Sequence, residues 1–582
     1  MTAVIKLSRP SLDALAAGGA DAAGLATLRS AQLSRHLLLL RLLVEQTPER
    51  DDVRPAIELL QEAQRADREA AELVLGYPYV GATLTAAIRR LRARDASPTS
   101  AGTLTAVAAA AGIRAGLDFT VRVPLPDSSD VLHLPTVGSA RVRPGGPENP
   151  ITVTRLHDRV TVGEVELPGD PELDGPGWQG LRSLDLSPGR TALDDLHAQR
   201  TPATVATADR LDPAEFERWR RLFREAVQRL SRRHDGWSWQ TASLLRAVTP
   251  LPPGPPGHGI SFTSRDAFGA ICLTWPGDPE LCCSTIVHEL QHGKFNALLD
   301  VVRLVDDEGE QTEYAPWRDD PRPLTALTNG CYAFLGVTTF WAAEQTSDSG
   351  DQRRATYEYA RAHLQVSRVI DTLSDSKGFT VDGRRFVAGM RTALEKLPDP
   401  AGPGPAYRIA RLVSAEHHIN WRLRNIRVDS RFTTAAAGAW RAGQPPPAIP
   451  PGAVAPGRDR FTEGARSRQW SAWGRRPEEL ASLPWPQASE TPELVRAADQ
   501  LLAVGDTAAA AERYRAALLL DPAADDAWVG LALARRSHAD RDARVWRERP
   551  ELPKAVCLAL LDGDGEPPDP VELAGWLAVA VR

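Results

Sequence analysis

The sequence has few cysteines, and their spacing does not suggest a structural framework. Five occur in 582 residues: Cys272, Cys282, Cys283, Cys331 and Cys557. An odd number without any CxxC pair argues against a disulfide framework and against a cysteine-based zinc or iron–sulfur site. This cysteine usage predicts a protein of the reducing cytoplasm.

Long apolar runs and an excess of positive charge are also lacking. The leucine-rich stretch at residues 37–43 is interrupted by Arg41 and preceded by His36, and the first ten residues contain no apolar segment. We therefore expect neither a signal peptide nor a membrane span. The formal charge is −6 at pH 7, the pI is near 6.1 and no basic block occurs, so nucleic acid is not an expected partner.

The residues that are present predict a globular, mainly helical chain. Hydrophobic residues make up 42% and charged residues 25%, which is the usage of folded proteins. Alanine and leucine recur at helical spacing up to about residue 115, whereas short alternations such as residues 120–123 indicate β-strands. The expected fold class is therefore mainly α with small β-sheet elements (α+β), and a length of 582 residues predicts roughly four domain-sized units or two large ones.

Changes of pattern along the chain predict five regions. They are an N-terminal helical region (1–115), a small β-rich region (116–190), a larger region (191–432), a Pro/Gly-rich linker (433–487) and a C-terminal helical region (488–582). The motif described below makes the region 191–432 the expected metal-binding catalytic domain. In the last region, small and aromatic residues such as Ala498, Tyr514 and Trp528 fall where a tetratricopeptide helix pair has them. One and a half such repeats do not stabilise themselves, so this region is expected to pack on the main body or to bind a partner.

The segment with the clearest chemistry is His288-Glu289-Leu290-Gln291-His292, an H-E-x-x-H motif within an apolar helical run. On a helix, the spacing of four residues places both imidazoles on one face, at a distance that suits one divalent ion. Glu289 points toward the neighbouring coordination space. The alternative is a pair of helix-face histidines that only make hydrogen bonds.

Two histidines do not complete a metal site, and they suit zinc and iron equally. No third histidine follows at the spacing that an extended zinc peptidase motif requires. Three downstream carboxylates on predicted helices are therefore candidates for the third ligand: Glu344, Glu358 and Glu416. Each of them could equally be a solvated residue on a helix face.

Several blocks of the sequence resemble one known family. The blocks are SRDAFGA (264–270), the motif with NALLD (296–300), APWRDDPRPL (315–324), YAFLGV (332–337), and Glu416-His417 with WRLR (421–424). Together they cover about residues 190 to 430 and are similar to the HExxH-motif proteins. Those proteins are encoded beside, or fused to, radical-SAM maturases of ribosomally made peptides in actinobacteria.

The resemblance implies an activity that the motif alone does not suggest. Members of this family are described as non-haem iron, 2-oxoglutarate-dependent enzymes that β-hydroxylate a residue of a precursor peptide, with a fold unlike jelly-roll oxygenases. It implies Fe(II) and 2-oxoglutarate as cofactors, a precursor peptide as substrate and a radical-SAM maturase as a partner. This chain has no CxxxCxxC signature of its own. His288 and His292 would supply the histidines, and the Glu-aromatic-Ala-Arg pattern at Glu358 favours this residue as the carboxylate ligand, with Glu416 as the runner-up.

The cosubstrate also requires a cation for its distal carboxylate, and arginine makes the bidentate contact. Arg322 and Arg318 on a proline-rich loop are the first candidates, followed by Arg422 and Arg265. The alternative for the first two is an ion pair with Asp319, with Asp320 or with a helix end. A further candidate, His417, would orient a ligand or touch the substrate, or it is a core histidine.

Two other function classes remain open at this stage. In a zinc metallopeptidase, Glu289 would act as the general base that deprotonates the zinc-bound water. A non-catalytic scaffold would bind peptides through the C-terminal helices.

Overall fold

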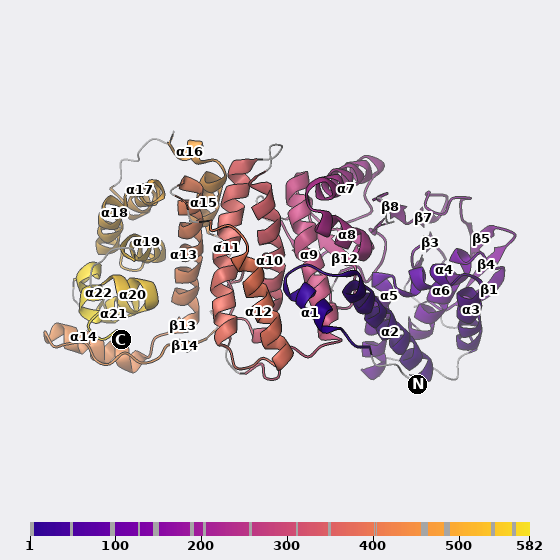
Figure 1. The fold of residues 1–582 in the computed structure, drawn as a ribbon, viewed down its shortest axis with the longest axis horizontal. Coiled ribbons are helices and arrows are strands. Elements are labelled where there is room, and N and C mark those ends of the chain that lie inside the picture. Colours follow the sequence, from indigo (N-terminus) through magenta and orange to yellow (C-terminus); the bar gives the residue numbers. More distant parts are fainter. Residues whose placement is uncertain are drawn as a thin grey trace. The chain divides into compact units, whose positions relative to one another are not determined.

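The computed structural model divides the chain into two compact units, an N-terminal unit (Met1–Leu304) and a C-terminal unit (Val305–Arg582). It describes residues 5–46, 51–93, 99–125, 129–143, 150–186, 191–201, 205–254, 259–309, 312–346, 351–400, 402, 404–455, 464–481, 489–536, 542–561 and 566–581. The elements of these ranges are mainly helices, with small sheets (Figure 1). The predicted fold class, mainly α with small β-sheet elements, is therefore confirmed, and the described residues contain no jelly-roll barrel.

Six helices open the N-terminal unit. They are α1 (Arg9–Ala16), α2 (Ala22–Gln46), α3 (Val53–Ala66), α4 (Arg68–Leu75), α5 (Pro78–Arg92) and α6 (Thr99–Arg114). Side chains cap two of them, because Ser8 accepts a hydrogen bond from the backbone N–H of Ser11 and Asp67 accepts one from that of Ala70. Residues 106–111 of α6 are small, apolar and buried, so α3 and α5 pack closely against this helix.

Two small antiparallel sheets follow. The first has the order β1 (Phe119–Val123), β4 (Ile151–Leu156), β5 (Arg159–Val162), β6 (Val165–Glu166); the second has the order β2 (Val131–Leu134), β3 (Gly138–Arg141), β7 (Trp178–Gly180). Val121 and Val153 are paired across β1 and β4, and both are buried. Gly138 must remain a glycine, because a Cβ atom there would lie 2.4 Å from the carbonyl oxygen of Gln179.

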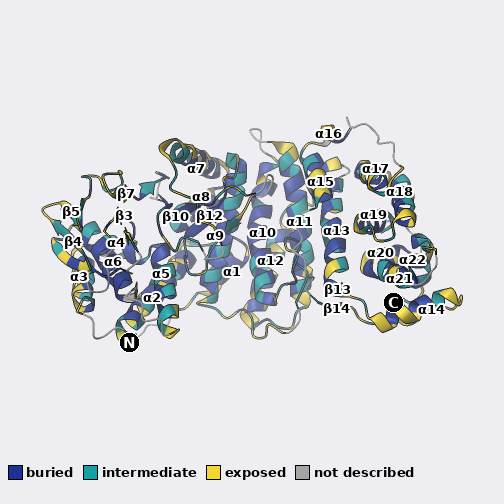
Figure 2. Ribbon diagram, turned by 180° about the vertical axis from the view of Figure 1, so that it is seen from behind, coloured by how far each residue is buried: buried dark blue, intermediate teal, exposed yellow. Residues whose placement is uncertain are grey.

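A mixed sheet positions the helix that carries the motif. Its strand order is β11 (Ser261–Phe262), β12 (Ala270–Leu273), β10 (Ala247–Pro250), β9 (Ala192–Leu193), β8 (Arg182–Ser183). The helices of this part are α7 (Pro213–Arg233), α8 (Asp235–Leu244) and α9 (Pro279–Leu299). β10 is parallel to β9 and β12, and every residue of β10 and β12 is buried, as is typical of parallel strands. Because α7, α8, β11 and β12 all contact α9, this helix lies in the interior of its unit (Figure 2).

Four long helices lie side by side in the C-terminal unit (Figure 1). They are α10 (Leu324–Glu344), α11 (Gln352–Asp375), α12 (Val381–Glu395) and α13 (Pro405–Asn425). The chain continues through β13 (Ile426–Arg427), α14 (Ser430–Arg441), β14 (Ala453–Val454), α15 (Ala465–Arg475) and α16 (Pro477–Ala481). α15 packs on both α11 and α13, and its Trp470 and Trp473 are buried there.

The chain ends in short helices that pack as consecutive pairs. They are α17 (Thr491–Val504), α18 (Thr507–Leu520), α19 (Asp525–Arg535), α20 (Ala543–Glu548), α21 (Glu551–Leu561) and α22 (Pro570–Leu577). Gly505 ends α17 in the left-handed conformation, with φ of 101°. Gly530 of α19 lies directly against the ring of buried Tyr514, where a Cβ atom would be 2.2 Å from a ring carbon.

The elements run through the predicted regions as follows. Helices α1–α6 fall within 1–115, and strands β1–β8 fall within 116–190. The range 433–487, expected to be a linker, contains most of α14 and all of α15 and α16, while residues 456–463 and 482–488 lie outside the described part. In the described ranges, no single helix is long and apolar enough to cross a membrane; only α4 with α5, bent by 56°, meets that criterion as a pair.

Candidate functional site

The H-E-x-x-H motif lies in the middle of α9, which has a well-defined start. The side chain of Asp278 accepts hydrogen bonds from the backbone N–H groups of Glu280 and Leu281, both at 3.0 Å. Pro279 occupies the first helical position, where no N–H donor is needed. This start and the burial of most of the helix fix the direction of α9 and the faces on which the motif residues lie.

His288 and His292 lie one turn apart on a half-buried face of α9. Their Nε2 atoms are 3.1 Å apart, and the two rings meet edge to face with their centroids 4.6 Å apart. Burial, and then the neighbouring His292, lower the pKa of His288 well below its ordinary value. The imidazole of His288 is therefore neutral, which is the form that binds metal ions.

The spacing of the two nitrogens fits a single divalent ion. Two nitrogen ligands at about 2.1 Å from one ion are about 3.0 Å apart at a right angle and about 3.4 Å apart at the tetrahedral angle. The observed 3.1 Å lies in this interval, and it also suits an N–H···N hydrogen bond. Within the ranges that the structure describes, no group of three or more His, Cys, Asp or Glu side chains could hold a metal ion. The third protein ligand therefore stays a prediction.

Glu289 lies on another face of α9 and is only 1% exposed. Its Oε2 accepts a hydrogen bond from Oγ1 of Thr263 at 2.6 Å, and Thr263 directly follows the edge strand β11. Burial raises the pKa of Glu289, while His292 and the hydroxyls of Thr263 and Ser261 act in the opposite direction. The side chain of Glu289 thus ties α9 to the mixed sheet.

Glu358, the favoured third ligand, is a buried residue of α11 that already has two cationic partners. Its Oε1 accepts a hydrogen bond from Nε of Arg475 at 2.8 Å, and its Oε2 accepts one from Nη2 of Arg361 at 3.0 Å. Burial alone would raise the pKa of Glu358, but the two guanidinium groups lower it. As a metal ligand, Glu358 would have to exchange at least one of these contacts.

The other two carboxylate candidates are also buried. Glu416 of α13 accepts hydrogen bonds from Oγ of Ser467 at 2.7 Å and from Nδ2 of Asn420 at 3.1 Å, and burial raises its pKa. Glu344 is 1% exposed at the end of α10. All three candidates belong to the C-terminal unit, whereas the histidines belong to the N-terminal unit. The choice among the three stays a prediction.

Arg318 and Arg322 both form ion pairs with the same carboxylate, Asp320, which belongs to their own loop. Nε of Arg318 donates to Oδ1 of Asp320 and Nη1 of Arg322 donates to Oδ2, both at 2.9 Å. Backbone hydrogen bonds between Glu313 and Arg322 close the loop. Burial would raise the pKa of Asp320, but the two guanidinium groups lower it. The structure therefore shows the ion pair with Asp320 that was the alternative to a cosubstrate contact.

The two remaining arginine candidates are also ion-paired. Arg422 makes a bidentate contact with Glu551, with N···O distances of 2.8 and 2.9 Å, and the Glu551 side chain is only 3% exposed. In the other unit, Arg265 pairs with Asp300 at 2.6 Å. Any of these arginines would have to release a carboxylate before it could bind a cosubstrate.

His417, the predicted second catalytic residue, lies in an aromatic and cationic environment. Its Nδ1 is 2.8 Å from the hydroxyl oxygen of Tyr314, and the Tyr314 ring also packs edge-on against His418. Burial, and then Arg361 and Arg368, lower the pKa of His417 to about 4. His417 is thus neutral at physiological pH, and Tyr314 is its direct partner.

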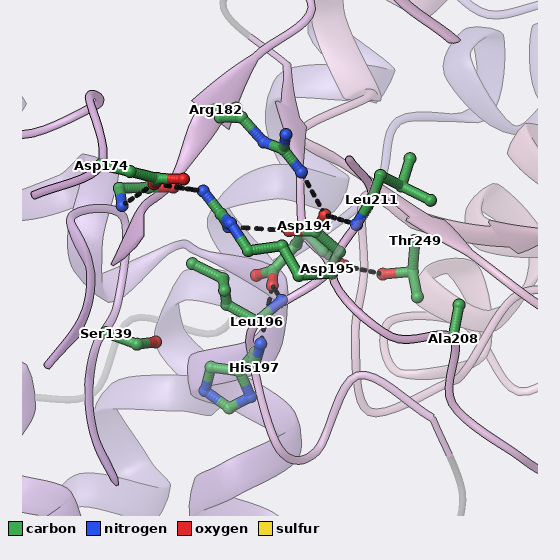
Figure 3. A network of polar contacts seen from close by, with 12 residues as sticks. Ser139, Asp174, Arg182, Asp194, Asp195, Leu196, His197, Ala208, Leu211 and Thr249 are labelled. Atoms are coloured by element: carbon green, nitrogen blue, oxygen red, sulfur yellow. Dashed lines mark hydrogen bonds and ion pairs between the residues drawn. The ribbon is translucent and has the colours of Figure 1, made fainter. Parts of the chain in front are cut away.

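The sequence analysis missed a buried polar network in the N-terminal unit (Figure 3). Asp195 accepts hydrogen bonds from Arg182 and Arg210, while the adjacent Asp194 accepts one from the hydroxyl of Tyr77 and one from the backbone N–H of His197. Each carboxylate is satisfied, so the network holds the segment after β9 in place. Two adjacent acids after a short strand are the only local signal, and a surface loop would have the same pattern.

Lys294, also missed, is a fully buried lysine two residues after the motif. Its Nζ donates to the carbonyl oxygens of Gly18 and Gly19 at 3.1 and 3.0 Å and to Oε1 of Gln240 at 2.5 Å. The ring of Trp237 lies 5.0 Å from Nζ. Burial lowers the pKa of Lys294 well below its ordinary value. Lys294 therefore anchors the motif helix to the α1–α2 turn and to α8.

Comparison of the chain with models of known protein families gives no match, and comparison with curated proteins gives none either. The resemblance to the HExxH-motif proteins therefore depends on the sequence blocks themselves.

Proposed function

We propose that the chain is a non-haem Fe(II)/2-oxoglutarate-dependent oxygenase that β-hydroxylates a residue of a ribosomally made precursor peptide. The resemblance of the blocks at 264–337 and 416–424 supports the activity and the peptide substrate. The pair of imidazole nitrogens 3.1 Å apart supports a site for a divalent ion. A radical-SAM maturase is the partner that the resemblance implies.

In this proposal, His288 and His292 hold the iron, and a carboxylate, for which Glu358 is the first candidate, completes the protein ligands. Iron bound by two histidines and one carboxylate retains open positions for a keto acid and for dioxygen, which is what hydroxylation requires. The low pKa of His288 keeps its imidazole neutral, so one ring nitrogen has a lone pair for a metal ion, and the position within a helix fixes the orientation of both rings. Lys294 and Asp278 hold that helix in place.

The observation that favours an oxygenase over a zinc peptidase is the environment of Glu289. A peptidase requires this carboxylate as a general base, within hydrogen-bonding reach of the water at the metal. Here Glu289 is 1% exposed, and one of its oxygens accepts the hydroxyl of Thr263. An oxygenase requires no such base, so a carboxylate that fastens the helix to the sheet is compatible with its chemistry.

The cytoplasm is the compartment that we propose for this activity. The structure shows all five cysteines as buried free thiols, as is usual for proteins of reducing compartments.

The test is reconstitution of the anaerobically purified chain with Fe(II) or with Zn(II). We expect the iron form to convert 2-oxoglutarate to succinate, and His288→Ala and His292→Ala each to lose both the metal and this turnover. The control is His157→Ala, because His157 is an exposed histidine outside the motif. Cleavage of a fluorogenic peptide mixture by the zinc form, without succinate from the iron form, would contradict the proposal.

A further inference from the structure

A cavity of about 900 Å³ lies within the C-terminal unit. Residues of α11 and α13 line it, together with residues around the ends of α17 and α19. Cavities that bind small molecules typically have volumes of about 300–1,000 Å³. The cavity is therefore large enough for a metabolite-sized ligand.

Four arginines line this cavity. Arg408 on α13 donates its Nε to the carbonyl oxygen of Ala503 at 3.0 Å. The other three lie on three different elements: Arg368 on α11, Arg411 on α13 and Arg536 at the end of α19. The described part of the chain provides no carboxylate in an ion pair with any of them. Arg368 lies over the ring of Tyr314 and Arg411 over that of Tyr407, each 5.8 Å from the ring centroid. The side chain of Arg368 also makes a hydrogen bond to the hydroxyl of Tyr314. A guanidinium has five N–H donors, so one such bond and contact with an aromatic face leave further donors for a ligand.

The positive charges of these side chains act on one another and on a neighbouring histidine. Burial, followed by Arg368 and Arg411, lowers the pKa of Arg536 to about 10. Burial, followed by Arg368, lowers that of His418 to about 2. Arg368 and Arg536 are half-buried, whereas Arg411 is exposed. Like charges held close together destabilise the fold unless an anion compensates them.

Three carboxylates also line the cavity. They are Asp371, Asp375 and Asp399. Asp371 forms an ion pair with Arg391 at 2.9 Å, and Arg391 does not line the cavity. The main causes of the pKa shift of Arg536 are burial and other arginines, and none of these three carboxylates is among them.

Two polar atoms of the cavity wall are also without a partner. Gln365 is 6% exposed, and its Nε2 donates to the carbonyl oxygen of Pro316 at 3.2 Å. Its Oε1, and Oγ of Ser414 on α13, have no hydrogen-bond partner among the described residues. Both atoms are fully enclosed by the protein, so a ligand in the cavity does not reach them and they are not part of the anion site.

We propose that this cavity binds a small organic anion with two or more carboxylate or phosphate groups, held by Arg368, Arg411 and Arg536. Arginine binds both groups through paired N–H donors, and three arginines from separate elements match a ligand with more than one anionic group. The inference does not depend on the metal site, because all these residues belong to the C-terminal unit.

The test is calorimetric titration of the full chain, dialysed free of metal, with tricarballylate, with pyrophosphate and with a glutamate-rich peptide. We expect one of the two small anions to bind, and the anion that binds tighter identifies the ligand as a carboxylate or as a phosphate. Arg536→Gln should weaken this binding at least tenfold. Arg431→Gln removes the same charge from an exposed position on α14 and should leave the binding within twofold.

Thermal unfolding provides the second measurement. The small anion should raise the melting temperature of the parent chain and of Arg431→Gln, but not that of Arg536→Gln. Without ligand, Arg536→Gln should melt no lower than the parent, because it removes a repulsive charge. The proposal is wrong if neither small anion binds, if only the acidic peptide binds, or if Arg536→Gln and Arg431→Gln weaken binding equally.

Discussion

Replacement of Glu289 by glutamine separates a structural role of this residue from a catalytic one. The amide oxygen of Gln can still accept the hydroxyl of Thr263, so Glu289→Gln exchanges a charge-assisted hydrogen bond for a neutral one. We expect the free energy of unfolding to fall by about 1 kcal/mol. Thr263→Val removes one of the two hydroxyl donors to this buried carboxylate, which should cost about 1.5–3 kcal/mol.

The catalytic expectation differs by orders of magnitude between the two enzyme classes. In an oxygenase, Glu289→Gln and Thr263→Val should each retain the conversion of 2-oxoglutarate to succinate within a few-fold. Removal of a general base in a peptidase typically costs about 10²–10⁴ in rate. The assays are denaturant unfolding, iron content and succinate formation at a temperature where all variants are folded.

A matched control lies on the same helix. Glu280 is also buried on α9, and it pairs with Arg229 at 2.7 Å. Glu280→Gln therefore reports the general effect of losing a buried carboxylate from this helix. Our argument from the environment of Glu289 fails if Glu289→Gln retains iron but forms succinate at least a hundredfold more slowly, while Glu280→Gln keeps its rate of succinate formation. Glu289 would then take part in the chemistry.

Three further predictions concern stability. Gly530→Ala places a methyl group against the ring of Tyr514 and should lower the free energy of unfolding by about 1–3 kcal/mol, measured with denaturant. Gly575→Ala, in an open part of α22, should leave it unchanged or raise it, and equal effects of the two substitutions would contradict this packing. Burial lowers the pKa of His197 to about 3, so the unfolded chain binds a proton at this residue at a higher pH than the folded chain does. The free energy of unfolding should therefore fall as the pH decreases below 6.5, by about 2.7 kcal/mol at pH 4.5, and His197→Gln should flatten this dependence on pH. Lys294→Met leaves the three acceptors of Nζ without this donor and should lower the free energy of unfolding by about 2–5 kcal/mol, measured with denaturant. An unchanged denaturation midpoint would refute the anchoring role of Lys294.

Features determined by residues close in sequence could be predicted. The start of α7 follows from Asp212 and Glu215, because a capping box depends only on side chains three residues apart, and the structure shows this box. The helix around His288 and His292 follows from the apolar run and the motif spacing, and the structure shows both rings on one face.

Features determined by distant residues could not be predicted. The partners of Glu358 and Arg422 are Arg475 and Glu551, which are 117 and 129 residues away, and no local pattern marks such pairs. The helix α15 was not predicted, because the glycine- and proline-rich segment before it makes the composition of residues 433–487 typical of a linker. The burial of Trp470 depends on tertiary contacts with α11 and α13.

The burial of Lys294 makes it a chemical reporter of motion in the motif helix. The chain contains only five lysines, and three of the others, Lys6, Lys377 and Lys396, are exposed, so an amine-reactive reagent modifies these quickly. Lys294 can react only when α9 separates from its neighbours, because its Nζ is enclosed and hydrogen-bonded. The rate of acylation at this single position, read by peptide mass mapping, therefore measures how often the helix with the two histidines opens in the native state.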